Sequence, residues 1–153
     1  MPMPGEQAPD FTLPRDGGGE ITLSALKGTK VVLYFYPRDN TPGCTTEALD
    51  FSARAADFAA AGTTVIGISR DSVASHDRFC SKHGLRIVLA SDVDGQTCEA
   101  WGVWVEKTLY GKTSMGIERS TFLIDAQGQV AEVWRKVKVK DHAEKVLEAA
   151  RAL

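Results

Sequence analysis

The chain has 153 residues, of which 43% are hydrophobic and 25% are charged, and its net charge at pH 7 is −2. This length predicts a single domain over residues 1–153 with a core of useful size. The near-neutral charge gives no support for a nucleic-acid partner, and no apolar segment approaches the roughly 20 residues that span a bilayer.

The first predicted elements are strands. Residues 11–13 and 20–23 flank a turn rich in glycine, which predicts an N-terminal β-hairpin. A buried strand is expected at 30–36, because its residues are mostly β-branched or aromatic and Pro37 ends the run. This strand leads directly to the most informative part of the chain.

A helix is predicted from about residue 42 to residue 60, closed by Gly62. Its apolar face consists of five residues at helical spacing: Cys44, Ala48, Phe51, Ala55 and Phe58. A second buried strand follows at 63–69, and a second helix at about 73–84. Strands and helices therefore alternate in this half of the chain.

The remaining elements complete an α/β protein. We expect, in chain order, a strand near 86–90, a short helix near 95–101, a hairpin made of 120–125 and 130–134, and a terminal helix at about 141–153. The basic run at 135–140 largely alternates charged and apolar side chains, which predicts an exposed strand face. Together these elements predict an α/β sandwich with a central mixed sheet flanked by helices.

Cys44 is the first candidate for chemistry. Thr41 followed by Pro42 predicts a helix start, with a hydroxyl N-cap and a proline at the first helical position. Cys44 then lies in the first turn, near unpaired backbone N–H groups and the positive end of the helix dipole, which favour a thiolate. A small buried hydrophobic residue is the alternative role for such a cysteine.

Pro37, Thr41 and Cys44 match the PxxxTxxC signature of peroxiredoxins. The wider segment 36–47 resembles the bacterioferritin-comigratory-protein, or peroxiredoxin Q, subfamily, and the likeness extends from residues 5–11 to residues 116–125. The resemblance implies a thioredoxin-like fold. It also implies a thiol-dependent peroxidase that uses neither a metal nor an organic cofactor.

The other two cysteines differ in their expected surroundings. Helix periodicity gives Cys80 only polar or small neighbours, which predicts a place on the solvent side, whereas Cys98 is expected in the core. Many members of the subfamily carry a resolving cysteine five residues after the peroxidatic one, but Leu49 occupies that position here. A second subgroup places it on the following helix, so Cys80 is the expected resolving cysteine, with resolution by an external thiol as the alternative.

Several further residues receive roles from the resemblance. Arg119 matches the arginine beside the peroxidatic sulfur, where a guanidinium stabilises the thiolate and the peroxide oxygens. Thr41 is expected to offer its hydroxyl to the peroxide, and the helix-start N–H groups, including that of Gly43, to hold it. Pro37 is expected to shield the sulfur, and Glu47 to orient Arg119. Each residue also has a plain structural explanation, as a helix cap, a strand end or a surface charge.

His76 and His83 lie seven positions apart on the helix that carries Cys80. Soft sulfur and imidazole suit zinc, but no second cysteine–histidine pair is close in sequence to complete four ligands. We therefore expect these histidines on a solvated polar face, with no metal site.

The expected activity is reduction of hydrogen peroxide and organic hydroperoxides by Cys44, with a Cys44–Cys80 disulfide that thioredoxin or a similar dithiol reduces. We expect the two sulfurs to lie too far apart for a disulfide in the reduced fold, so that the first turns of the 42–60 helix and part of the 73–84 helix unwind on oxidation. Resolution within one chain favours a monomer. Two rivals are a redox-regulated binding or chaperone protein and, with His76 or His83 as base, a cysteine hydrolase.

The cellular compartment is predicted from the cysteines and the first residues. Three cysteines, an odd number without close pairing, indicate free thiols in a reducing compartment. The first six residues lack the basic and apolar regions of a secretory signal. We expect a cytoplasmic protein.

Overall fold

A computed structural model describes all residues from Met1 to Leu153. The nine strands are β1 (Thr12–Pro14), β2 (Glu20–Thr22), β3 (Lys30–Phe35), β4 (Thr63–Ser69), β5 (Val88–Ser91), β6 (Trp104–Leu109), β7 (Lys112–Ile117), β8 (Ser120–Ile124) and β9 (Val130–Trp134). The helices are the 3₁₀ helix η1 (Leu23–Leu26) and α1 (Pro42–Ala53), α2 (Ala55–Ala60), α3 (Val73–His83), α4 (Gln96–Ala100) and α5 (His142–Ala152). No helix combines the length and the apolar character needed to cross a membrane.

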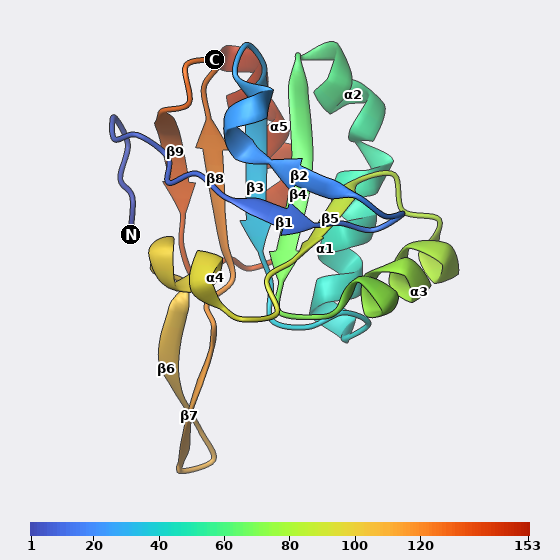
Figure 1. Cartoon of the computed structure of the whole chain (residues 1–153), viewed down its shortest axis with the longest axis vertical. Coiled ribbons are helices and arrows are strands. Elements are labelled where there is room, and N and C mark those ends of the chain that lie inside the picture. The colour runs from blue at the N-terminus through green and yellow to red at the C-terminus, as the bar shows by residue number, and fades with distance from the viewer.

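The central sheet is mixed, as expected. Its five strands lie in the order β5-β4-β3-β8-β9, with β3, β4 and β5 parallel and β8 and β9 antiparallel to their neighbours. Helices α1, α2 and α5 cover one face, and the β1–β2 hairpin crosses the other (Figure 1). This arrangement confirms the α/β architecture with an N-terminal hairpin.

Strand β3 supplies side chains to both faces of the sheet in strict alternation. Val31, Leu33 and Phe35 belong to an apolar cluster with the β1–β2 hairpin and α4. The alternate residues Val32 and Tyr34 belong to a second cluster that α1, α3 and α5 complete. Because successive strand residues point to opposite faces, a continuous apolar strand is buried on both sides.

The predicted helix 42–60 is interrupted. It forms two helices, α1 and α2, which meet at Arg54. Of the predicted apolar face, Cys44, Ala48, Phe51 and Phe58 are buried, but Ala55 is only half-buried. Ala55 comes directly after the break, and Phe58, one turn further along α2, is buried again.

The structure adds one element to those expected and corrects another. Residues 104–117 form the β6–β7 hairpin, which projects beyond the body of the protein (Figure 1). Its strands are exposed on both sides over most of their length, so they lack the alternation that marks a strand. The basic run 135–140 is a loop and not a strand, because β9 ends at Trp134 and Lys136 has a φ of 48°.

Candidate active site

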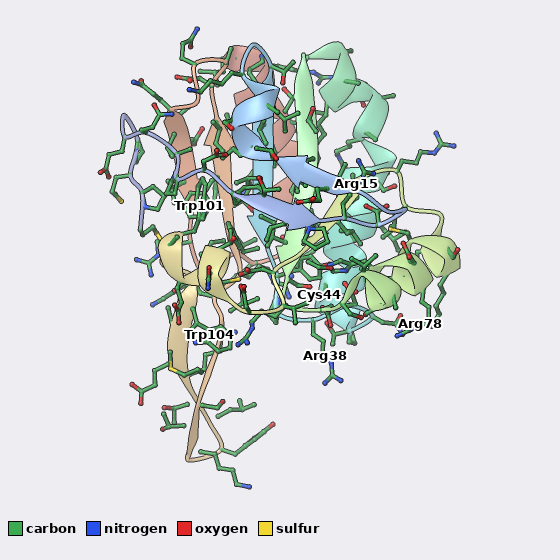
Figure 2. All side chains as sticks on the ribbon, in the orientation of Figure 1. Arg15, Arg38, Cys44, Arg78, Trp101 and Trp104 are labelled. Carbon is green, nitrogen blue, oxygen red and sulfur yellow. The ribbon has the colours of Figure 1, made fainter.

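The loop between β3 and α1 delivers Cys44 to the end of the sheet. Cys44 is the third residue of α1 and is 1% exposed. Figure 2 shows it at the lower end of the sheet, with Arg38 pointing away into solvent and Trp104 at the base of the projecting hairpin. The first N–H groups of a helix have no intrahelical partner, so those of Gly43 and Cys44 are free for a ligand beside the sulfur.

Arg119 contacts the Cys44 sulfur from the junction between β7 and β8. Its Nη2 donates to Cys44 Sγ at 3.3 Å, and its Nη1 donates to Glu47 Oε1 at 2.6 Å. A Cβ on Gly43 would lie 3.3 Å from Nη2, so the glycine gives the guanidinium room to approach the helix. The structure thus brings together four of the predicted site residues: Cys44, Arg119, Glu47 and Gly43.

Glu47 is buried one turn after Cys44. Its side chain is 1% exposed and its Oε2 has no hydrogen-bond partner. Burial raises the pKa of Glu47 to about 7, although the charge and hydrogen bond of Arg119 act in the opposite direction. Glu47 therefore holds one nitrogen of the guanidinium and leaves the other to face the sulfur.

Thr41 and Pro37 both lie in the loop that leads from β3 to α1. Thr41 occupies the N-cap position, but its Oγ1 donates to the carbonyl of Arg38 at 2.9 Å and makes no capping bond. The expected hydroxyl cap is therefore wrong, because the preceding turn uses the hydroxyl. Pro37 is exposed and lines a groove of about 410 Å³ that Trp104 and Met115 of the hairpin also line.

Cys80 is half-buried on α3 and does not face open solvent as predicted. Its Sγ donates to Asp16 Oδ2 at 3.6 Å, and the thiol packs against the apolar cluster under α1. Burial and the nearby Asp16 carboxylate raise the pKa of Cys80 to about 12. The covering group comes from the turn of the β1–β2 hairpin, 64 residues away, which helix periodicity cannot anticipate.

All three cysteines are free thiols in this structure. Cys98 is fully buried, as predicted, in the apolar cluster on the hairpin side of the sheet. Burial and the neighbouring Asp92 raise the pKa of Cys98. Cys98 is therefore a core residue, whereas Cys44 and Cys80 both contact the opposite cluster.

His76 is fully buried, so the prediction of a solvated face is wrong for this residue. Its Nδ1 lies 2.7 Å from Asp39 Oδ2, and its Nε2 lies 3.0 Å from the carbonyl oxygen of Ala90. His83 is half-buried, with its Nε2 3.4 Å from Asn40 Oδ1. Neither histidine bonds to Cys44, so the Cys–His pair that a cysteine hydrolase needs is missing.

Asp39, Asp71 and His76 form the one grouping of potential metal ligands, with their ligand atoms within 4.8 Å of one another. Their chemistry does not suit a cation. Both ring nitrogens of His76 face oxygen acceptors, and the Asp39 carboxylate already accepts hydrogen bonds from the hydroxyl groups of Tyr36 and Ser75. The grouping is a buried hydrogen-bonded ion pair that fastens α3 to the loop before Cys44.

Known proteins are similar to this chain in sequence and fold. Residues 4–133 match the AhpC/TSA family. The chain is 53% identical over 143 residues to "Peroxiredoxin Bcp" of Xanthomonas campestris, covering 94% of this chain and 89% of that protein. It is 48% identical over 147 residues to "Peroxiredoxin Bcp" of Bacillus subtilis, covering 96% of this chain and 94% of that protein.

A solved structure extends the similarity to three dimensions. The bacterioferritin comigratory protein of Xanthomonas campestris, whose structures are described in terms of its alkyl peroxide reduction activity, superposes with a TM-score of 0.89. It is 51% identical, and the match covers 93% of this chain and 90% of that one.

Proposed function

This chain belongs to the AhpC/TSA family and, within it, to the Bcp/PrxQ peroxiredoxins, which are thiol peroxidases of thioredoxin-like fold, and we propose that Cys44 is its peroxidatic residue. The observation that carries this assignment is the Arg119 Nη2 contact to Cys44 Sγ at 3.3 Å. A permanently charged donor against a buried sulfur at a helix start is suited to an ionised nucleophile.

The first step is attack of the Cys44 thiolate on the outer oxygen of the peroxide. The S–O bond forms as the O–O bond breaks, and the leaving oxygen takes a proton and departs as water or an alcohol. Arg119 and the N–H groups at the start of α1, including that of Gly43, lie where negative charge develops on the two oxygens. We assign Thr41, at the N-cap of α1, and Pro37, in the preceding loop, to positioning the peroxide.

The second step is attack of the Cys80 thiolate on the sulfur of the Cys44 sulfenic acid. Cys80 first loses its thiol proton, the S–S bond then forms as the S–O bond breaks, and the leaving oxygen takes a proton and departs as water. In the reduced fold Cys44 Sγ faces Arg119, whereas Cys80 Sγ faces Asp16. The two thiols therefore point to different partners, which supports unwinding at the first turns of α1 and in part of α3 before they join.

Several properties of the cycle extend this proposal. Thioredoxin or a similar dithiol reduces the disulfide. Hydrogen peroxide and organic hydroperoxides are both substrates, and the groove beside Pro37 offers about 410 Å³ for an organic group. Both cysteines come from one chain, which favours a monomer, and three free thiols suit the reducing cytoplasm.

The deciding experiment is intact mass with non-reducing peptide mapping after one equivalent of hydrogen peroxide. We expect wild type to lose two hydrogens and to yield a Cys44–Cys80 peptide. In Cys80→Ser we expect a sulfenic or sulfinic adduct on Cys44. A reduced Cys44 in wild type would contradict the proposal.

Turnover with a dithiol separates the peroxidase from its remaining rival. Wild type is expected to consume peroxide continuously, whereas Cys80→Ser is expected to stop after one turnover unless a small external thiol is present. A redox-regulated binding protein would form the disulfide without continuous turnover. Cys98→Ser is the matched control, because Cys98 lies in the other apolar cluster, and we expect it to behave as wild type.

A further inference from the structure

A buried ion pair joins the loop before Cys44 to the helix that carries Cys80. Asp39 lies in the loop between β3 and α1, and His76 lies one turn before Cys80 on α3. Their side chains are 3% and 0% exposed, and Asp39 Oδ2 and His76 Nδ1 are 2.7 Å apart. No other ion pair in the protein links these two segments.

The surrounding hydrogen bonds define the charge state of the pair. His76 has an oxygen acceptor at each ring nitrogen, the Asp39 carboxylate and the Ala90 carbonyl, so both nitrogens must carry protons to satisfy both contacts. Asp39 also accepts from the Tyr36 hydroxyl at 2.5 Å and from the Ser75 hydroxyl at 2.8 Å. The geometry is that of an imidazolium and a carboxylate, fully paired and shielded from water.

Breaking such a pair one partner at a time is costly, because the partner left behind is a buried charge without compensation. The ion pair therefore stabilises the contact between α3 and the loop before Cys44 as long as α3 stays folded. Unwinding that includes the first turn of α3 would carry both His76 and Ser75 away from Asp39, and the carboxylate would keep only its hydrogen bond from the Tyr36 hydroxyl. Movement of Cys80 and release of the pair are coupled through the helix backbone.

We propose that the Asp39–His76 ion pair is a positioning device, which holds α3 folded in the reduced enzyme and sets the rate at which Cys80 reaches the oxidised Cys44. The inference rests on the proposed role of Cys80 as resolving cysteine. It assigns a function to two residues that do not touch the peroxide. A slower release leaves the sulfenic acid exposed for longer, so the pair also sets how readily Cys44 is oxidised further to the sulfinic acid.

The proposal has a pH dependence whose sign can be worked out. Burial lowers the pKa of His76, but the hydrogen bond and charge of Asp39 outweigh it and the pKa is raised. The Ala90 carbonyl and Asp71 act in the same direction, and Tyr36 is the other titratable group in contact. The cationic side chain of Arg78, on α3 itself, points into solvent, as does that of Arg38 (Figure 2).

A group with a raised pKa in the folded state stabilises that state at low pH and loses its effect as the pH rises through the raised pKa. In the unwound helix the pKa of His76 returns to its ordinary value of about 6.5. Unwinding of α3 therefore becomes easier between about pH 6.5 and the raised pKa. Each unit between the two pKa values multiplies the unwound population by about ten.

The first test follows His76 directly in the wild-type protein by nitrogen NMR of its imidazole ring. We expect both ring nitrogens to be protonated at about pH 7 in the reduced enzyme, and a pKa near 6.5 in the Cys44–Cys80 disulfide form. A singly protonated ring in the reduced enzyme, or the same titration in both forms, would overturn the proposal.

The second test measures disulfide formation by rapid quench after stoichiometric peroxide. We expect His76→Gln to form the disulfide about tenfold faster than wild type at about pH 6, with the ratio falling towards one at about pH 9. His83→Gln is the matched control on the same helix and should follow wild type at both pH values. The contribution of Cys80 ionisation cancels in the ratio.

A ratio that is independent of pH would show that His76 acts only through packing and would overturn the proposal, as would a ratio near one throughout. Asp39→Asn/His76→Gln removes both charges together and provides a second variant should the single substitution prevent folding. We expect it to be fast at every pH, and a double variant as slow as wild type at about pH 6 would also contradict the inference. Failure to form any Cys44–Cys80 disulfide would instead contradict the proposed function.

Discussion

Two thiols that the proposed reaction joins lie on neighbouring helices, yet groups of opposite charge hold them. A guanidinium donates to Cys44 Sγ, whereas the Cys80 thiol donates to a carboxylate. The first arrangement supports a thiolate and the second keeps a proton on sulfur. The reduced structure therefore favours the proposed order of the two steps, because Cys44 has a cationic donor beside its sulfur and Cys80 keeps its proton against a carboxylate.

The largest effect should come from removing the cation at the first sulfur. We expect Arg119→Met to slow the reaction of Cys44 with peroxide by about 10²–10³-fold, because the charged donor beside the developing oxyanion is lost. Stopped-flow kinetics with stoichiometric peroxide would measure this step alone. Arg135→Met is the control, since Arg135 is also paired with a glutamate, Glu118, but makes no contact with Cys44. A decrease of less than tenfold in the rate for Arg119→Met would show that Arg119 does not activate Cys44.

A smaller effect is expected on stability from Glu47, which anchors that cation. Because burial raises the pKa of Glu47 to about 7 in the folded state, its contribution to the free energy of unfolding is present at acid pH and is lost as the pH rises towards 7. The free energy of unfolding of Glu47→Gln, relative to that of wild type, should therefore rise by up to about 3 kcal/mol between about pH 4.5 and about pH 8. Guanidinium unfolding of both proteins at the two pH values measures the change, and parallel behaviour would show that Arg119 keeps Glu47 ionised throughout.

The smallest effect should come from neutralising the carboxylate at the second sulfur. Asp16→Asn keeps an oxygen to accept the Leu89 N–H but removes the negative charge that helps to raise the pKa of Cys80. In a Cys44→Ser background we expect alkylation of Cys80 to become about tenfold faster at about pH 8. Asp10→Asn, which lies away from α3 in contact with Ser24, should leave the rate unchanged. Equal rates in both variants would mean that burial alone protects the thiol.

The sequence alone predicted the position of Cys44, because that position depends on local structure. Thr41 and Pro42 mark the helix start, and this placed Cys44 in the first turn of α1. Arg119 was assigned only through the family resemblance, because it lies 75 residues from Cys44 and nothing in its own neighbourhood marks it.

The predicted surroundings of Cys80 and His76 were wrong for a physical reason. Cys80 and His76 were both placed in solvent because a helix shows its own periodicity but not what covers it. Their partners, Asp16 and Asp39, lie 64 and 37 residues away. A buried histidine facing two acceptors looks, in sequence, like any polar residue of an exposed helix.

The sequence contains one weak indication of the β6–β7 hairpin, which was not predicted. Its two-residue turn, Tyr110 and Gly111, has positive φ values of 52° and 76°, as short hairpins require. Glycine in such a turn between residues of high β-propensity can indicate a hairpin even when neither face is apolar. The hydrophobic pattern carried no information here because this hairpin stands clear of the core.

The alternation of side chains along β3 has a consequence for durability over many catalytic cycles. The two apolar clusters contact β3 from opposite faces of the sheet. Only the cluster that α1, α3 and α5 complete contains Cys44 and contacts Cys80. The other cluster, with the fully buried Trp101 and Cys98, takes no part in the proposed helix movements. In the proposed cycle this cluster would stay folded while α1 and α3 unwind, so that the two helices would refold against an intact core and the rest of the chain would stay protected from aggregation.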